Sequence, residues 1–204
     1  MTKQIDEQTR NESRRAAILE AAQTCFFQYG LERTRMDDIA RLAQISRPAL
    51  YEHFENKSAI FLALARHLIQ SFLAAADREL HGPGPVWPRI AAAFEVWSVK
   101  PLEMIMAAPH ADEMILAGSG LAAGVYHEGR EKFCQSLVNV LQKATRNGEI
   151  DLKTVGLTVT AIADLIVTAA AGAKEDWKDV TQYRKRLAGL IRVFETATKN
   201  LNLT

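Results

Sequence analysis

The sequence has little of what marks several common protein classes. It has two cysteines in 204 residues, and because Cys25 and Cys134 lie far apart on apolar helical patterns, we expect buried thiols rather than a disulfide or a metal site. No run of about 18 apolar residues occurs, so no transmembrane helix is expected. The charged, polar start MTKQIDEQTR does not resemble a signal peptide, which makes the cytoplasm the expected location.

Motifs for catalysis are lacking as well. The sequence contains no Gly-rich phosphate loop, no nucleophile elbow and no cysteine pair. His110, Asp112 and Glu113 have the composition of a metal site, but positions i, i+2 and i+3 do not share one helical face well. Acids in the first turn of a helix are the simpler interpretation. We therefore expect no enzymatic activity, no metal and no cofactor.

Excess positive charge is the third feature that the sequence lacks. A net charge of +1 gives no bulk attraction to nucleic acid, and between positions 13 and 57 seven basic residues stand against six acidic ones. Binding to DNA would depend on where the charges lie rather than on their total. With 48% hydrophobic residues, the chain can bury a substantial core in one or two domains.

What the sequence does contain is a helix-turn-helix pattern between Arg33 and Lys57. Thr34, followed by Asp37, predicts the capped start of a short helix that ends near Ala43. Apolar residues recur within that helix at helical spacing, namely Met36, Ile39, Ala40 and Ala43.

A second short helix is predicted directly after the turn. Ser46 is a good N-cap and Pro48 is tolerated in the first helical turn, so the helix should run from Arg47 to about Phe54. Leu50 and Phe54 share one face and would be buried. Such a helix pair is typical of DNA-binding proteins, in which the second helix enters the major groove.

Helix N-termini and basic residues gather in the same stretch. Thr34, Ser46 and Asn56 mark three predicted N-termini, whose unpaired N–H groups and dipoles suit phosphate oxygens. The basic residues near these ends are Arg33, Arg35, Arg47 and Lys57. Phosphates of the DNA backbone are therefore the expected partners of this surface.

The residues of this stretch resemble the tetracycline-repressor-like (TetR) family of transcriptional regulators. The resemblance covers about residues 11–72 and rests on nine typed positions, which are Thr34, Ile39, Ala40, Ser46, Leu50, Tyr51, His53, Phe54 and Lys57. It implies an all-α fold, with an N-terminal three-helix helix-turn-helix domain and a C-terminal helical domain for ligand binding and dimerisation. The residues implied to face bases are Arg47, Pro48 and Ala49. Those implied to face phosphates are Thr34, Ser46, Tyr51, His53 and Lys57, and Arg35 at the same helix end completes the predicted DNA-binding set.

The stretch departs from the family pattern at the turn and at the start of the second helix. The turn carries Ala43-Gln44 where Ala-Gly is usual, and Pro48 and Ala49 stand where Gly and Thr are frequent. Pro48 and Ala49 offer no polar side-chain group to a base, so Arg47 is the expected base reader.

The chain is predicted to divide into three segments, which are a flexible arm at 1–11, a helix-turn-helix domain at 12–72 and a ligand-binding and dimerisation domain at 73–204. Thr9 and Glu12 are expected to cap the first helix, which Gly30 should end. From Lys57 a long amphipathic helix of about 23 residues should lead out of the small domain. The Gly- and Pro-rich residues 81–85 should stop it.

The remaining sequence is helical, with irregular breaks. A helix that opens at Pro88 should stop before Pro101, and a longer helix should run from about Ala122 to Arg146. We find no alternating strand pattern of convincing length and no internal repeat. Irregular packing of this kind tends to leave cavities.

The last two predicted helices carry more apolar residues than one helix face can bury. Asp151 or Thr154 is expected to cap the first of them, and Asp179 the second. An exposed stripe on both would be a large apolar patch, so we predict a two-fold homodimer interface there. The interface set is Leu165, Ala169, Gly172, Tyr183, Leu187, Leu190, Ile191 and Phe194. The alternative is that both helices close the core of the monomer.

Aromatic and sulfur side chains suggest a pocket for a small hydrophobic ligand. The candidate lining residues are Trp87, Phe94, Trp97, Met104, Met106, His110, Met114, Tyr126, Phe133 and Trp177. Glu103, Asp112 or Glu113 could serve as a polar anchor, and each apolar residue could equally be part of the core.

Together these patterns predict an all-α, homodimeric, sequence-specific DNA-binding transcriptional regulator. We expect a repressor that binds a palindromic double-stranded operator and is released by a small hydrophobic effector. Two alternatives remain open, which are a helical protein-interaction module without DNA function and a small-molecule enzyme. The sequence identifies neither the ligand nor the operator, and an activator is equally compatible with it.

Overall fold

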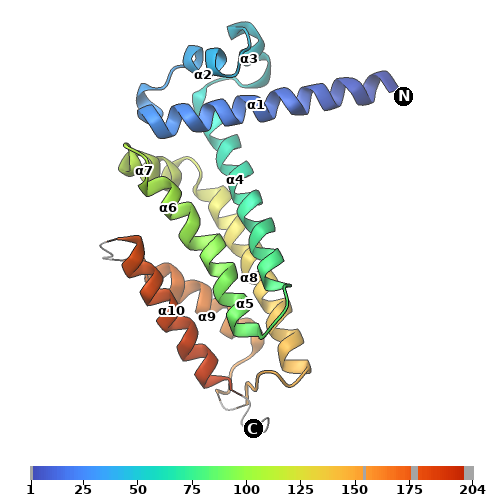
Figure 1. The fold of residues 1–204 in the computed structure, drawn as a ribbon, viewed down its shortest axis with the longest axis vertical. Helices are drawn as coiled ribbons and strands as arrows, with labels where there is room; N and C mark the ends of the chain where they lie inside the picture. The colour runs from blue at the N-terminus through green and yellow to red at the C-terminus, as the bar shows by residue number, and fades with distance from the viewer. Residues whose placement is uncertain (1, 154, 176–178, 200–204) are drawn as a thin grey trace. The chain divides into compact units, whose positions relative to one another are not determined.

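The computed structural model describes residues 2–153, 155–175 and 179–199, and within these ranges the regular structure is helical (Figure 1). In chain order the helices are α1 (Thr2–Arg33), α2 (Met36–Leu42), α3 (Arg47–His53), α4 (Lys57–Leu80), α5 (Val86–Phe94), the π-helix η1 (Glu95–Val99), α6 (Lys100–Met106), α7 (Ala111–Gly120), α8 (Ala123–Arg146), α9 (Val159–Gly172) and α10 (Val180–Ala197). The described residues also hold an isolated antiparallel bridge between Ile150 and Lys199. The predicted all-α class is confirmed.

The chain packs as two compact units. One, the head unit, comprises Met1–Ile69 and Met104–Tyr126, and the other, the second unit, comprises Gln70–Glu103 and His127–Thr204. By packing, α7 therefore belongs with the helix-turn-helix. The predicted boundary at residue 72 divides the chain by function and stays a prediction.

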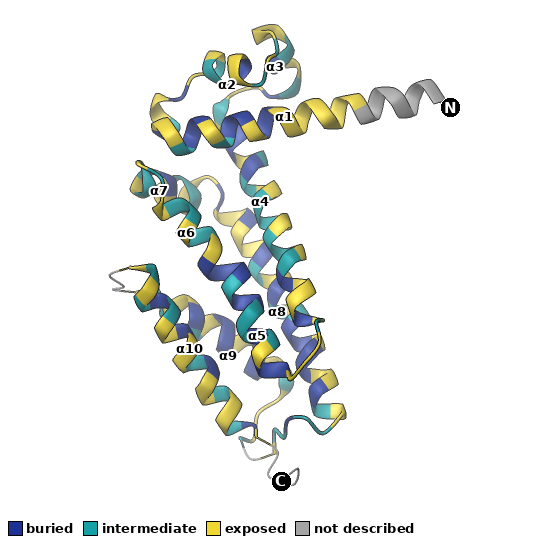
Figure 2. Ribbon diagram, viewed as in Figure 1, coloured by how far each residue is buried: buried dark blue, intermediate teal, exposed yellow. Residues whose placement is uncertain are grey.

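The core of the head unit joins the first four helices to α7. Its fully buried side chains include Ile18, Phe26, Ile39, Leu50 and Ile60, and Met114 from α7 belongs to the same cluster. Phe26 and Phe61 meet edge to face, with their ring centroids 5.7 Å apart, an arrangement that aromatic quadrupoles favour. Figure 2 shows these buried positions along α1 and at the start of α4. This core fixes the positions of the two short helices.

Helix α1 differs from its prediction at the N-terminal end. It begins at Thr2, so the expected Thr9 cap is wrong, and the flexible arm predicted for 1–11 stays a prediction. Lys, Gln and Glu in this stretch are good helix formers, and helix propensity does not require an apolar stripe. At the other end, Gly30 has φ 81° and ψ 165°, which breaks the helix one turn before Arg33, as predicted.

Helix α4 has the predicted length, at 24 residues. Contrary to the sequence expectation, it is long and apolar enough to cross a membrane by length and composition. The expectation considered only unbroken apolar runs, whereas residues 59–76 contain Ser, Gln and His but only one charged residue, Arg66. One such helix is a weak indication, because core helices of soluble proteins pass the same test. Ile60 and Phe61 of α4 do lie in the core of the head unit.

In the second unit the predicted stop before Pro101 is wrong. The chain stays helical from Val86 to Met106, because the π-helix η1 lies immediately before Pro101. Proline lacks an N–H, and in a helix its ring crowds the carbonyl four residues earlier. A widened turn accommodates both the missing hydrogen bond and the bulky ring. Phe94 and Phe133 meet edge to face at 5.0 Å and Trp97 stacks on Phe133 at 5.3 Å, which forms an aromatic core.

The caps of the last helices are predicted in part. Asp179 Oδ1 accepts from Gln182 N at 2.8 Å, as expected for the start of α10. For α9 the expected Asp151 cap is wrong, and Thr154 lies outside the described residues. Thr158 is the N-cap and accepts from Ala161 N at 3.1 Å, because the chain first turns through Gly156 with φ 65°. Asp151 instead accepts from Lys153 N in the loop.

Candidate nucleic-acid interface

Helix α3 has the geometry predicted for a DNA-reading helix. Ser46 Oγ accepts from Ala49 N at 3.3 Å, so the expected N-cap is confirmed. Leu50 is fully buried and Phe54 is 5% exposed, which anchors one face of the helix in the head core. The opposite face presents exposed Arg47, Pro48 and Tyr51, with Ala49 half-buried. A helix with one anchored face and one free polar face can enter a groove without unfolding.

Arg47, the predicted base reader, is held by two neighbours. Its Nη1 lies 3.1 Å from Asp37 Oδ2 of α2, and its guanidinium lies 5.7 Å from the centre of the Tyr51 ring. The hydrogen bond with Tyr51 and the charge of Asp37 both raise the pKa of Arg47 above its ordinary value. The side chain stays largely exposed, so the ion pair is solvent-screened and leaves the guanidinium available to a stronger partner. The sequence interpretation missed this role of Asp37 because it assigned that residue to the cap of α2.

The turn between α2 and α3 places a non-glycine residue in a left-handed conformation. Gln44 has φ 56° and occupies the position where the family usually has Gly. Ile45 N donates to Ala40 O at 3.0 Å and Gln44 N donates to Arg41 O at 3.2 Å, which is the hydrogen-bond pattern of a Schellman cap. The turn therefore keeps its geometry, at the cost of backbone strain at Gln44.

The predicted cap at Thr34 is wrong. Thr34 is 1% exposed, and its hydroxyl donates to Gly30 O at 2.6 Å and lies 3.2 Å from Cys25 O. The N-cap of α2 is Arg35, whose backbone N–H donates to Asp38 Oδ2 at 3.2 Å. The hydroxyl turned inward because carbonyls freed near the Gly30 break needed a donor. In this structure Thr34 orders the α1–α2 junction, and its predicted phosphate contact stays a prediction.

Lys57 has a similar internal role. The predicted Asn56 cap of α4 is confirmed, with Ala59 N donating to Asn56 Oδ1 at 2.9 Å. Lys57 Nζ donates to Glu32 O at 2.7 Å and to Thr34 O at 3.3 Å, so two of its three protons serve the same junction. One proton stays available for a phosphate. Of the other predicted phosphate ligands, Arg35 is exposed and His53 is half-buried.

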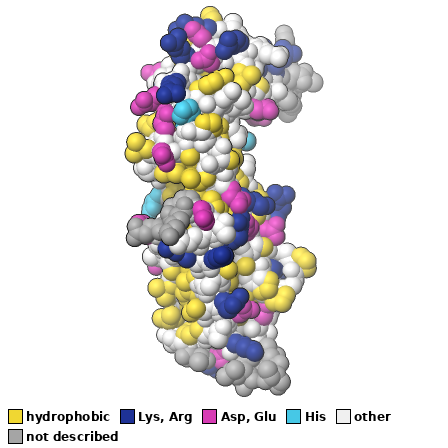
Figure 3. All heavy atoms as spheres, turned by 60° about the vertical axis from the view of Figure 1, so that its left-hand side comes forward, with side chains coloured by type: hydrophobic (Ala, Val, Ile, Leu, Met, Phe, Trp, Pro, Cys, Tyr) yellow, Lys and Arg dark blue, Asp and Glu magenta, His cyan; other side chains and the backbone are white. Residues whose placement is uncertain are grey.

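Charges around the helix-turn-helix are mixed. Arg15 of α1 lies 4.5 Å above the Phe54 ring, a cation–π contact that fixes it beside the end of α3. Arg41 pairs with Asp38 at 3.1 Å. The upper part of Figure 3 shows basic and acidic side chains side by side. Contact with DNA would therefore depend on a few placed cations.

The predicted ligand-pocket residues do not fall in one unit. Trp87, Phe94, Trp97 and Phe133 are buried in the second unit, whereas Met104, Met106, His110, Met114 and Tyr126 belong to the head unit. Trp177 lies outside the described residues. Met106 and Tyr126 are more than 40% exposed. A common pocket for this set stays a prediction.

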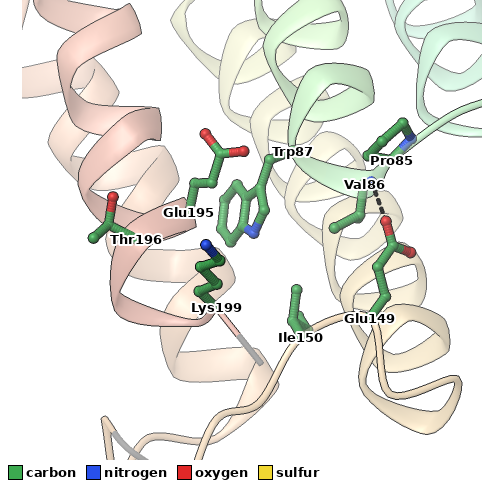
Figure 4. Close-up of a pocket in the computed structure, with 8 residues that line it drawn as sticks. All are labelled: Pro85, Val86, Trp87, Glu149, Ile150, Glu195, Thr196 and Lys199. Carbon is green, nitrogen blue, oxygen red and sulfur yellow. Dashed lines mark hydrogen bonds between the residues drawn. The ribbon is translucent and has the colours of Figure 1, made fainter. Parts of the chain in front are cut away.

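A pocket of about 430 Å³ lies in the described part of the second unit, and the sequence did not single out its lining residues as a set (Figure 4). Of the predicted pocket residues it contains only Trp87, and the full lining is Pro85, Val86, Trp87, Glu149, Ile150, Glu195, Thr196 and Lys199. Glu149 accepts from Val86 N and lies 3.9 Å from Arg89. The indole nitrogen of Trp87 is buried and finds no partner among the described residues. The lining offers apolar surface together with both signs of charge.

The predicted dimer-interface residues on α9 and α10 lie partly in the interior and partly on the surface of the second unit. Tyr183, Leu187 and Ile191 are at most 5% exposed and pack inside the second unit, so this monomer buries them by itself. Leu165 of α9 is 44% exposed and Val193 of α10 is 64% exposed, and Gly172 and Gly189 have open space around them. Figure 2 shows buried and exposed positions alternating along α10. The hydrophobic periodicity marked α10 but did not tell its inner stripe from its outer one.

Both cysteines are free thiols. Cys25 is buried in the head core, as predicted, whereas Cys134 on α8 was predicted to be buried and is only half-buried. Burial is the largest cause that raises the pKa of both thiols, which disfavours the nucleophilic thiolate. Among the residues that the structure describes, no group of three or more metal-binding side chains occurs.

Comparison with known proteins supports the helix-turn-helix assignment. Residues 18–64 match the profile of the family described as bacterial regulatory proteins, tetR family. A helix-turn-helix transcriptional repressor from Mycobacterium tuberculosis is 37% identical over 67 residues, which is 33% of this chain and 36% of that protein. The regulator TtgR from Pseudomonas putida is 44% identical over 65 residues, 31% of each chain. The chain thus matches about a third of the length of these relatives.

Solved structures extend the likeness of fold to nearly the whole chain. A protein from Rhodococcus sp. described as a TetR-family transcriptional regulator superposes with a TM-score of 0.64 at 22% identity, covering 89% of this chain and 98% of that one. SmeT, the repressor of the Stenotrophomonas maltophilia multidrug efflux pump SmeDEF, superposes with a TM-score of 0.65 at 17% identity, covering 93% and 92%. The fold and the anchored α3 define a helix-turn-helix protein. Its residues 18–64 match the TetR family, and nearly the whole chain shares its fold with solved structures described as regulators of that family.

Proposed function

We propose that this protein is a sequence-specific DNA-binding transcriptional regulator, acting as a repressor that a small hydrophobic ligand releases. The observation that carries the proposal is α3, which is capped by Ser46, anchored by Leu50 and Phe54, and free on the face of Arg47 and Tyr51. Arg47 would read a base edge, and Tyr51, Ser46 and Lys57 would hold phosphates on either side of the groove.

The proposed assembly is a homodimer on a palindromic operator. Two recognition helices reach successive major grooves when they lie about 34 Å apart, and a two-fold dimer supplies that spacing. The outer faces of α9 and α10, with Leu165, Val193, Gly172 and Gly189, support this assembly, because exposed apolar and small residues allow close helix contact. In the lower left part of Figure 3, at the height of α9 and α10, hydrophobic side chains gather on the surface.

The proposed effector is a small hydrophobic molecule bound in the second unit. The aromatic core around Phe133 and the pocket beside Trp87 support this idea, since apolar cavities with a few polar groups are the usual ligand sites. SmeT has been solved in complex with triclosan. Ligand binding would shift the dimer between arrangements that fit and do not fit the operator. We place the protein in the cytoplasm, where its DNA target lies.

The test is fluorescence anisotropy on labelled DNA from the region upstream of the protein's own gene, titrated at several salt concentrations. Saturable binding that survives nonspecific competitor, with a log–log salt slope of several units, is expected of an operator-binding dimer. If that DNA is bound no better than competitor, a selection from random sequences follows. A selection that enriches no sequence would reject the regulator and favour a protein-interaction module. Turnover of a small molecule would indicate an enzyme.

A further inference from the structure

The α1–α2 junction forms a hydrogen bond with a helix that lies far away in the sequence. Glu113, in the first turn of α7, accepts a hydrogen bond from the backbone N–H of Glu32 at an N···Oε1 distance of 2.5 Å, across 81 positions of sequence. Glu32 lies in the single turn that follows the break at Gly30. The first N–H groups after a helix break lack partners within the helix, and a carboxylate is a strong acceptor for one of them.

Gly30 shows independently that this contact is tight. A Cβ atom at position 30 would lie 2.2 Å from Glu113 Oε2, and the φ of 81° is unfavourable for any residue with a side chain. Only glycine therefore lets the carboxylate approach the backbone so closely. The same glycine ends the long part of α1 and provides the carbonyl that binds the Thr34 hydroxyl.

Glu32 is held from its other side as well. Its carbonyl accepts from Lys57 Nζ of α4 at 2.7 Å, so one residue bonds α7 through its N–H and α4 through its C=O. Lys57 also bonds Thr34 O, directly before the N-cap of α2. The junction that sets where α2 and α3 begin is thus fixed by two other helices.

Both contacting helices belong to segments of the chain that are continuous with the second unit. Helix α4 continues past Ile69 into the second unit, and α7 lies in the segment from Met104 to Tyr126 that returns from the second unit and goes back to it. The chain crosses between the two units three times, within α4, α6 and α8. Lys57 lies at the start of α4, and Glu113 lies on the segment between the crossings in α6 and α8.

We propose that Glu113 is a positioning residue for DNA binding: its carboxylate latches α7 to the Gly30–Glu32 backbone and holds the helix-turn-helix in its operator-binding arrangement. This inference rests on the proposed function, because it names the contact through which that function is regulated. Release of the latch would loosen the start of α2 and leave the phosphate-binding groups of α3 intact.

The test compares Glu113→Ala and Glu113→Gln with the neighbouring acid variant Asp112→Ala. Hydrogen exchange of the amides at 30–35 should be about tenfold faster in Glu113→Ala, since a charge-assisted hydrogen bond is lost. It should be close to wild type in Glu113→Gln, whose amide oxygen still accepts, and unchanged in Asp112→Ala. Unchanged exchange in Glu113→Ala would overturn the latch.

DNA binding is measured on the same variants, below their melting temperatures. Operator affinity should fall roughly three- to tenfold in Glu113→Ala, with the affinity for random DNA and the salt slope unchanged. A merely destabilised protein would lose both affinities together. If Glu113→Ala exchanges faster but keeps full operator affinity, the contact exists but does not affect DNA binding, and the proposed positioning role would be wrong. A wild type that selects no sequence would instead reject the proposed function, and the exchange result would still decide whether the contact exists.

Discussion

The helix-turn-helix and the α9–α10 pair use their side chains in opposite ways. In the helix-turn-helix, the helix caps are local, because Ser46 and Asn56 each accept a hydrogen bond from a backbone N–H three residues further on. In α10, by contrast, order comes from distant contacts. Tyr183 bonds Ser98, and Arg184 bonds both Glu95 and Glu103. The first region starts its helices from local caps and leaves the outer face of α3 exposed, although Lys57 and Glu113 hold its junction with α1 from a distance. Helix α10, by comparison, is held mainly by distant partners.

The largest expected effect tests whether the outer face of α10 is an interface. Val193→Arg would put an unpaired charge into a dimer interface, which costs about 3–5 kcal/mol and should weaken association by a hundredfold or more. Sedimentation velocity over a concentration series measures it. Leu116→Arg is the control, because Leu116 is 73% exposed on α7. Equal effects of the two substitutions would mean that α10 has no special role in assembly.

The inner face of α10 should respond differently. Leu187→Ala leaves a cavity in the second unit, and we expect the free energy of unfolding to fall by about 2–5 kcal/mol. Urea denaturation at several protein concentrations separates this loss from a change in association. Leu190→Ala, at a half-buried position of the same helix, should cost less. If the stability lost in Leu187→Ala depended strongly on protein concentration, and that in Leu190→Ala did not, Leu187 would be part of the dimer interface.

In the helix-turn-helix, the expected effects concern recognition rather than folding. Arg47→Ala should relax preference at one base pair by roughly tenfold, because a guanidinium that reads guanine is lost. Tyr51→Phe should weaken binding to all sequences alike, since a phosphate contact carries no base information. Binding selections on randomised operators distinguish the two patterns. If Arg47→Ala left the base preference unchanged, Arg47 would not be a base-contacting residue.

The smallest effect concerns two Schellman caps, which lie at Gln44 and Gly148. Gln44 closes α2 with φ 56°, and Gly148 closes α8 in the same way with φ 74°. Gln44→Gly should raise the free energy of unfolding by about 0.5 kcal/mol, because relief of left-handed strain exceeds the added chain entropy. Gly148→Ala should lower it by about 1 kcal/mol. Thermal denaturation checks both, and a destabilised Gln44→Gly would show that the Gln side chain contributes to the turn.

These contrasts also explain how much the sequence could reveal. The caps at Ser46, Asn56 and Asp179 were predicted correctly because their partners lie within a few residues. Thr34 had the same local pattern, yet burial beside Gly30 gave its hydroxyl another acceptor. Local signals are sufficient only where no tertiary contact competes with them.

Long-range features were beyond the sequence for a physical reason. A stripe such as Tyr183, Leu187 and Ile191 shows that one face is buried, but an inner and an interfacial face have the same periodicity. The contact of Glu113 with Glu32 joins residues 81 positions apart and has no sequence pattern. A glycine at position 30 was visible, but only the structure shows the carboxylate that it admits.

The π-helix η1 has a consequence for insertions and deletions. A π-turn holds one residue more than an α-turn, and each residue of an α-helix turns the helix by about 100°. Loss of a single residue between 96 and 99 would convert this turn to an α-turn and leave Glu103 on nearly the same face relative to Glu95, because the wide turn already absorbs one residue. Arg184 bonds both carboxylates at once, at 2.7 and 2.5 Å. A one-residue deletion in η1 should therefore preserve the bonds of Arg184 to both carboxylates, whereas the same deletion at 100–102 in α6 would rotate Glu103 by about 100° and break one of them.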